Sequence, residues 1–231
     1  VPMDTTENIL KKKEEECRPK KQNPDTPHAI RKFRENCAEG NYAYISYALV
    51  NGFKSINAQD PVTGDTPLQL AVRRGDMATI QELIKYCAEP NYRNNLGLSA
   101  QHEAWAFWKF HHNRTKGERE AQEQKTYDIL YSMFKVGGFV DAQTSDGETA
   151  MHMACRLGPI KVVLLCLAFK ANPNICTKVK VTPSGEEIGG LTPWDLAAMH
   201  GRHETCQLLE CWNNIKHQTV LTDFIVVWRN F

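Results

Sequence analysis

The sequence predicts an all-α solenoid of stacked helix-turn-helix units, and two observations support this. The first is self-similarity, because the segments 64–91, 147–174 and 190–212 align in one register. In each, a Gly is followed two residues later by Thr, five further on by Ala and four beyond that by another Gly. The second is composition, since 231 residues of which 42% are hydrophobic and 24% charged suffice for one elongated repeat array. A helix pair that cannot bury its own apolar face is stabilised by stacking on its neighbours.

The first helix of each unit is predicted from its start and its end. Thr66 and Thr192 are followed by Pro, which suits the first turn of a helix because its missing N–H needs no partner there. One turn later a bulky residue faces the core, and then a small residue falls where neighbouring units come close. A Gly in the left-handed conformation is expected to end the helix. The bulky, small and helix-ending residues are Leu68, Met151 and Trp194, then Ala71, Ala154 and Ala197, then Gly75, Gly158 and Gly201.

This pattern resembles the ankyrin repeat, whose period is about 33 residues. The resemblance implies an ankyrin-repeat solenoid with β-hairpin-like finger loops, covering residues 29–212. Its repeats are expected at about 29–58, 59–92, 93–142, 143–175 and 176–212. Residues 1–28 are expected to form a charged helical leader and linker. Residues 213–231 are a cap or docking tail, whose apolar run at 224–228 is either a strand or coil covering the last repeat or a segment that docks onto another chain.

An insertion is predicted in the third repeat. Gly75 and Gly158 lie 83 residues apart, where two periods give about 66. The extra residues fall at 108–124, and the simplest arrangement lengthens both helices of the repeat by roughly two turns each. Trp105, Trp108 and Phe110 would then pack against the second helix at Tyr127, Leu130 and Phe134, with residues 113–117 as the tip.

A second insertion is predicted at 176–189, between the fourth and fifth repeats. Lys and Val alternate at 178–181, and the residues at 182–185 are Thr-Pro-Ser-Gly. This combination indicates a β-hairpin, which would lengthen the finger loop.

No catalytic or metal site is predicted. His200, His203 and Cys206 have the spacing of zinc ligands on one helical face, but Gly201 is expected to end the first helix between them. His102 and His152 occupy the position of the family's motif His, for which the resemblance implies a structural hydrogen bond between loop and helix. Neither nucleotide-binding nor hydrolase motifs occur. We therefore expect no enzymatic activity, no cofactor and no small-molecule substrate.

Charge, hydropathy and cysteine usage narrow the partner and the compartment. The net charge of +1 gives no overall field toward nucleic acid. The longest strongly apolar run, 162–169, is far shorter than the roughly 20 residues of a membrane span. The eight cysteines include no CxxC pair, and Cys155, Cys166 and Cys206 fall within helical apolar patterns. This favours reduced thiols in the cytoplasm.

The resemblance implies a non-catalytic scaffold or adaptor that binds another protein through its concave face, finger tips and first-helix ends. Carried onto this sequence, those positions are Asp65, Arg73, Arg74, Leu98, Glu148, Arg156, Leu157, Leu191, Met199 and His200. Phe107, off the packed face of the insertion, is a further candidate contact. One alternative is a structural subunit of a large cytoskeletal, ciliary or organellar assembly, anchored by its insertions and tails. Another is the regulatory array of a larger enzyme.

Overall fold

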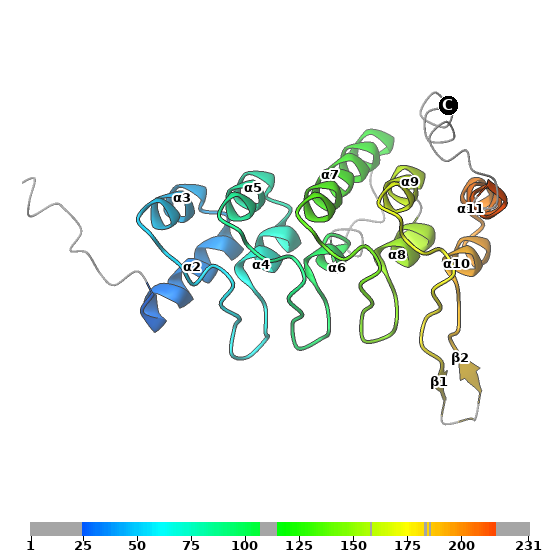
Figure 1. The fold of residues 1–231 in the computed structure, drawn as a ribbon, viewed down its shortest axis with the longest axis horizontal. Helices are drawn as coiled ribbons and strands as arrows, with labels where there is room; N and C mark the ends of the chain where they lie inside the picture. The colour runs from blue at the N-terminus through cyan, green and yellow to red at the C-terminus, as the bar shows by residue number, and fades with distance from the viewer. Residues whose placement is uncertain (1–24, 107–114, 158, 183, 185, 216–231) are drawn as a thin grey trace, which may run out of the picture.

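The computed structural model describes residues 25–106, 115–157, 159–182, 184 and 186–215, and in this part the helices stand in antiparallel pairs along one row (Figure 1). The pairs are α2 (Pro27–Glu39) with α3 (Tyr42–Val50), α4 (Pro67–Arg74) with α5 (Met77–Lys85), α6 (Ala100–Glu103) with α7 (Lys116–Lys135), α8 (Ala150–Leu157) with α9 (Ile160–Ala168), and α10 (Pro193–Met199) with α11 (His203–Ile215). The all-α repeat solenoid predicted from the sequence is confirmed.

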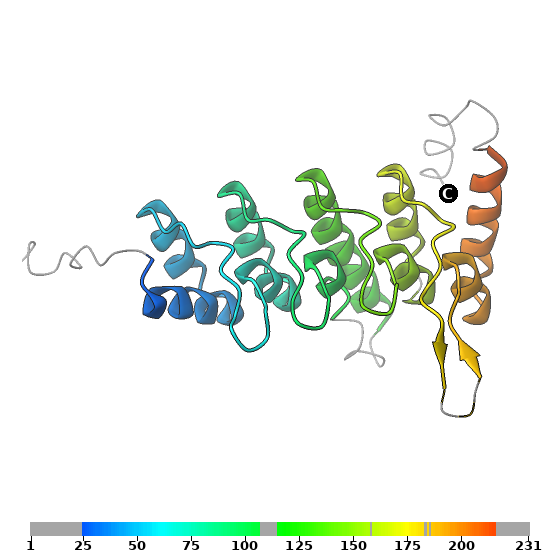
Figure 2. The ribbon, with the colours of Figure 1, turned by 60° about the horizontal axis from the view of Figure 1, so that its bottom comes forward.

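Three layers run the length of the molecule. The first helix of each pair belongs to an inner row and the second to an outer row, and finger loops project from one edge of the inner row (Figures 1 and 2). The inner row is α2, α4, α6, α8 and α10; the outer row is α3, α5, α7, α9 and α11; the fingers connect each outer helix to the next inner helix. Because each pair contacts its neighbours in the row, one hydrophobic core extends along the array.

The inner helices begin and end as the sequence predicts. The hydroxyl of Thr66 caps α4 by accepting from the backbone N–H of Gln69 at 3.2 Å, and Pro67 occupies the first turn. Gly75 and Gly201 follow their helices with φ of 70° and 66°, in the left-handed region. Gly158, predicted to do the same, lies outside the described residues.

The repeated small residues lie in the core, and two of the three bulky ones do so. Ala71, Ala154 and Ala197 are completely buried, as predicted. Leu68 and Met151 are also buried, whereas Trp194, at the same position of α10, remains 38% exposed. The prediction that Trp194 is a core residue is therefore wrong. In the described part of the chain no helix pair follows α10 and α11, so α10 packs on one neighbouring pair fewer than α4 and α8 do.

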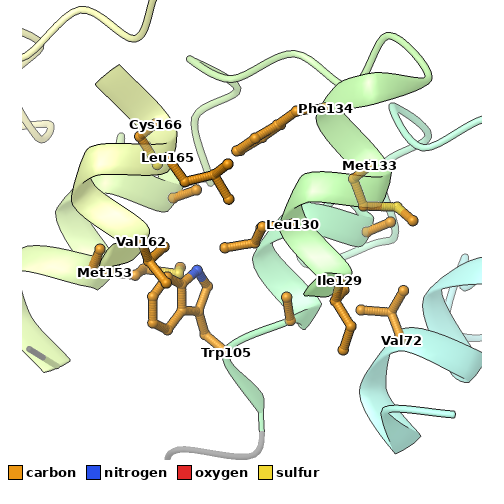
Figure 3. Packing of buried hydrophobic residues seen from close by; sticks show 14 of the residues in the cluster. Val72, Trp105, Ile129, Leu130, Met133, Phe134, Met153, Val162, Leu165 and Cys166 are labelled. Carbon is orange, nitrogen blue, oxygen red and sulfur yellow. The ribbon is translucent and has the colours of Figure 1, made fainter. Parts of the chain in front are cut away.

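The insertion does not lengthen both helices of its pair. Helix α6 ends at Glu103, while α7 has 20 residues against nine in α5 and α9. The extra residues of α7 therefore all lie at its N-terminal end, before the part that aligns with α5 and α9. Trp105 is 3% exposed and its ring lies beside Met153 and Val162 of the next pair (Figure 3). Helix α6 ends before Trp105, so the indole ring packs in the core between repeats. It does not belong to a protruding hairpin.

Several predictions about the insertion concern residues outside the described part. Trp108, Phe110 and the first two residues of the expected tip at 113–117 belong to this group. Within the described part, α7 begins after Thr115, whose hydroxyl caps the helix at Glu118. Residues 115–121 are all exposed. The first two turns of α7 thus project beyond the packed array.

The predicted hairpin is confirmed. Strands β1 (Lys180–Val181) and β2 (Glu187–Ile188) pair antiparallel, with Lys180 opposite Ile188 and Val181 opposite Glu187. They lengthen the finger between α9 and α10, the longest in Figure 2.

The described cysteines are free thiols, and those at 37, 155 and 166 are buried. Burial raises the pKa of the Cys166 thiol to about 12, so this thiol packs as an uncharged apolar group. None of the helices in the described ranges combines the length and the apolarity needed to cross a membrane.

Candidate interaction surface

The fingers contact one another directly along their row. Gly64 and Gly147 have left-handed backbones, and each packs against the next finger. A methyl group on Gly64 would lie 2.8 Å from the backbone nitrogen of Asn95, and one on Gly147 would lie 2.6 Å from that of Lys178. Main-chain hydrogen bonds of 2.9 Å join the same fingers, from Asn95 N to the carbonyl of Thr63 and from Lys178 N to that of Asp146. Only glycine fits these contacts, and the fingers therefore form one continuous row.

Three inner helices, α4, α6 and α8, also hold the following finger through a side chain in their first turn. Nδ1 of His102 accepts from the backbone N–H of Ser99 at 3.1 Å, and its Nε2 donates to the carbonyl of Ala142 at 2.8 Å. His152 makes the same connection, donating to the carbonyl of Leu191 at 3.2 Å. The structural role predicted for both histidines is confirmed.

Burial keeps these rings neutral. It lowers the pKa of His102 to about 4 and the pKa of His152 below its ordinary value. Gln69 occupies the equivalent position in α4 and reproduces the connection, because its Oε1 accepts from Thr66 N at 2.8 Å and its Nε2 donates to the carbonyl of Leu98 at 2.7 Å. The position therefore requires one acceptor and one donor, and not an imidazole as such.

A buried ionic clasp joins the second and third helix pairs. Arg73 binds both oxygens of Asp65 at 3.0 Å, and it also binds Glu103 through Nε at 2.9 Å and Nη2 at 2.8 Å. Asn94 donates to Asp65 at 2.8 Å and to Glu103 at 3.2 Å. Both carboxylates are almost fully buried. Although burial opposes it, hydrogen bonding from Arg73 and Asn94 keeps the pKa of Asp65 below its usual value.

Two of the predicted contact residues, Asp65 and Arg73, belong to this clasp. Asp65 is 3% exposed, so the expectation that it lies free at a finger tip is wrong. The Arg73 side chain is partly exposed, but its guanidinium is occupied by the two carboxylates. Local spacing could not reveal the pairing with Glu103, because this residue lies 30 residues along the chain from Arg73.

A similar ion pair occurs two repeats later. Arg156 binds the two oxygens of Glu148 at 2.7 and 3.2 Å, and both side chains are partly buried. The next residue, Leu157, is half-buried, and its carbonyl accepts from Arg202 at 3.1 Å. These predicted contact residues are therefore engaged within the array.

In the fifth helix pair the same two positions are apolar. Leu191 and Met199 stand where Glu148 and Arg156 stand in the fourth pair. Met199 is 69% exposed, whereas Leu191 is half-buried with its carbonyl held by His152. His200 is exposed, and its Nδ1 lies 2.9 Å from the carbonyl of Leu196. At this end of the inner row, Met199 therefore presents an apolar side chain to the solvent.

The remaining predicted contacts differ in accessibility. Arg74 is exposed and lies against Gly40 of the preceding pair. Leu98 is half-buried, and its backbone bonds to Gln69 and Asn94. Phe107 lies outside the described residues.

Two exposed apolar residues at the finger tips were not predicted. Val62 is 80% exposed and Leu96 is 68% exposed, and they belong to adjacent fingers. Their signal in the sequence is an apolar residue within a run of turn-forming residues, Asp60-Pro61 before Val62 and Asn94-Asn95 before Leu96. An apolar side chain at such a position has no core to enter.

His200, His203 and Cys206 are divided by Gly201, as the sequence predicts, with His203 and Cys206 on α11. Within the described residues, no three His, Cys, Asp or Glu side chains are grouped so that they could hold a metal ion.

The fold and this surface define a repeat solenoid with a row of contacting fingers. Comparison with protein families supports that assignment, because the ankyrin repeat model matches residues 63–95 and 146–178. These two segments contain the α4–α5 and α8–α9 pairs, each with its preceding finger tip. A comparison with curated proteins gave no match.

Proposed function

We propose that this chain is a non-catalytic scaffold or adaptor of five ankyrin repeats that binds a protein partner in the cytoplasm. Ankyrin repeats form protein-interaction domains, and two segments of the chain match them. The pairs α2–α3, α6–α7 and α10–α11 share the stacking of the matched pairs, which supports counting them as repeats. The free thiols of the described part support a reducing compartment.

One observation carries the proposal. The fingers and inner row form a continuous surface held by inter-repeat hydrogen bonds, and exposed apolar side chains stand on it at Val62, Leu96 and Met199. An ordered surface binds at a smaller entropic cost than a mobile one, and apolar residues within a polar rim are typical interface anchors. Arg74, at the end of α4, and His200, next to Met199, supply further exposed polar groups.

The partner is best identified by affinity capture with mass spectrometry, followed by quantitative binding of point variants. Leu96→Asp and Met199→Asp should each weaken binding at least tenfold, because each puts a charge into an apolar contact. Tyr47→Asp is the matched control, since Tyr47 is exposed on the outer helix α3. If Tyr47→Asp abolished binding while both other variants bound normally, the interface would lie on the outer row and the proposal would fail.

A second candidate function, a structural subunit of a permanent assembly, is favoured by the projecting start of α7. Residues 115–121 are exposed on a helix that extends about 16 Å further than its neighbours. An anchoring role predicts that the captured partner stays bound in high salt and that deleting 108–124 releases it. A scaffold that uses the finger surface predicts that binding survives this deletion.

A further inference from the structure

The described array ends at a side that no described element covers. Helices α10 and α11 stand last in the row in both views (Figures 1 and 2). Gly190 shares the left-handed backbone of Gly64, Gly97 and Gly147, with φ of 68°. The three earlier glycines each pack against the next finger, but a methyl group on Gly190 would meet, among the described residues, only Val179 of its own finger. The docking position for a following segment is therefore present and uncovered by the described residues.

The residue that holds a following finger is different in the last pair. Gln69, His102 and His152 each donate a hydrogen bond to a carbonyl of the next finger. Asp195 takes this position in α10, and its Oδ2 accepts from Thr192 N at 2.7 Å and from the Thr192 hydroxyl at 2.6 Å. A carboxylate accepts hydrogen bonds and has none to donate. The Asp195 carboxylate can therefore accept hydrogen bonds from N–H groups of a following segment. It cannot donate to the carbonyls of a finger.

The side chains of this end face are partly apolar and partly acidic. Trp194 is partly exposed, and its Nε1 donates to Glu210 at 3.1 Å. The equivalents of these residues in the fourth pair, Met151 and Leu167, are both buried. Glu210 stands in the fifth pair where Leu167 stands in the fourth. This makes the end face too polar to stack against another full repeat, as expected for the end of an array.

The chain that follows α11 is long enough to reach this face. In the earlier repeats, the residue that packs on the preceding glycine lies ten positions after the outer helix ends: Asn95 follows Lys85, and Lys178 follows Ala168. Helix α11 is described as far as Ile215, and the sequence continues from there to 231. The apolar run at 224–228 lies in this stretch, which is longer than the ten positions needed in the earlier repeats.

We propose that residues 216–231 cover this end face in the same chain. The apolar run lies across Trp194, and N–H groups of the segment donate to Asp195. The charges are complementary, because the face carries Asp195 and Glu210 while the segment contains Lys216 and Arg229 against one acid, Asp223. The segment closes the array without being a sixth repeat.

The test is hydroxyl-radical footprinting of the full-length chain, read at Trp194 by mass spectrometry. The double variant Ile225→Asp, Val227→Asp should raise the labelling of Trp194 at least threefold. Thr219→Asp, outside the apolar run, should leave it unchanged. Met199 serves as the internal control because it is exposed on the inner row, away from the proposed contact. A chain ending at Ile215 should match the double variant, and a synthetic peptide of residues 216–231 should restore protection.

Two results would overturn the proposal. Equal labelling of Trp194 in the wild type and the double variant would mean that the segment does not cover the face. Protection that grows with protein concentration, together with a dimer in light scattering, would mean that the segment of a second copy occupies it.

Discussion

At the scale of single residues, adjacent arginines in α4 have different tasks. Arg73 closes the clasp between two buried carboxylates, whereas Arg74 lies against Gly40 of the preceding pair. Removing one partner of a buried ionic cluster leaves its counter-charges uncompensated, which is more damaging than losing an exposed charge. Sequence spacing gave both arginines the same role, and only the packing of α4 against α6 separates them.

Arg73→Ala should therefore lower the free energy of unfolding by about 2–4 kcal/mol, because Asp65 and Glu103 remain buried without their cation. Arg74→Ala should change it by less than about 0.5 kcal/mol. Urea unfolding of both variants at pH 7 measures the difference. Equal stabilities would show that water screens the clasp and that it contributes little.

His102→Gln should reduce the loss of stability in acid. The folded pKa of His102 is about 4, against about 6.5 when unfolded. The stabilising contribution of the neutral ring is thus complete above pH 6.5 and is lost as the pH falls toward 4. Gln69 shows that glutamine can make both hydrogen bonds at this position. The variant should match the wild type at pH 7.5 and gain roughly 2 kcal/mol relative to it at pH 5, as measured by denaturant unfolding at each pH. Parallel pH profiles for the two proteins would contradict the assignment.

At the scale of elements, the sequence predicts what local chemistry determines. Thr-Pro starts and glycine stops mark the ends of the inner helices, and the Lys-Val alternation marks the hairpin. The division of the insertion between α6 and α7 depends instead on where Trp105 packs. Apolar periodicity is equally compatible with a longer helix or with a chain that turns into the core.

The contact residues show the same division. Exposure at Met199 follows from its position in the repeat, but the burial of Asp65 depends on partners from another repeat. The sequence does contain a signal for the ion pairs. An acid and an arginine occur eight residues apart in two repeats, Asp65 with Arg73 and Glu148 with Arg156, and both positions are apolar in the fifth.

Excision of residues 108–124 should leave a cooperatively folded array. The core residues of this repeat, Trp105, Ile129, Leu130 and Met133, lie outside the cut, and Gln122 is the only described residue within it that is buried. The circular dichroism signal at 222 nm should fall with the lost helical residues, while thermal unfolding stays a single sharp transition. A broad or absent transition would mean that the start of α7 or the segment before it belongs to the core.

At the scale of the whole molecule, the proposed function assigns stability and binding to different parts of one array. Stacking between neighbouring pairs supplies the core, and the inter-repeat hydrogen bonds of Gln69, His102 and His152 fix the fingers to it. The exposed residues on the fingers and inner row can therefore be changed without unfolding the array. This separation is the central claim of the proposed function.

Hydrogen exchange of the full-length chain, with and without its captured partner, tests that claim most directly. We expect slower exchange in the partner complex at the finger tips around Val62 and Leu96 and near Met199, with the outer helices α3, α5 and α9 unchanged. Protection confined to the outer helices, with unaltered exchange at all three finger and inner-row positions, would contradict the proposed interaction surface.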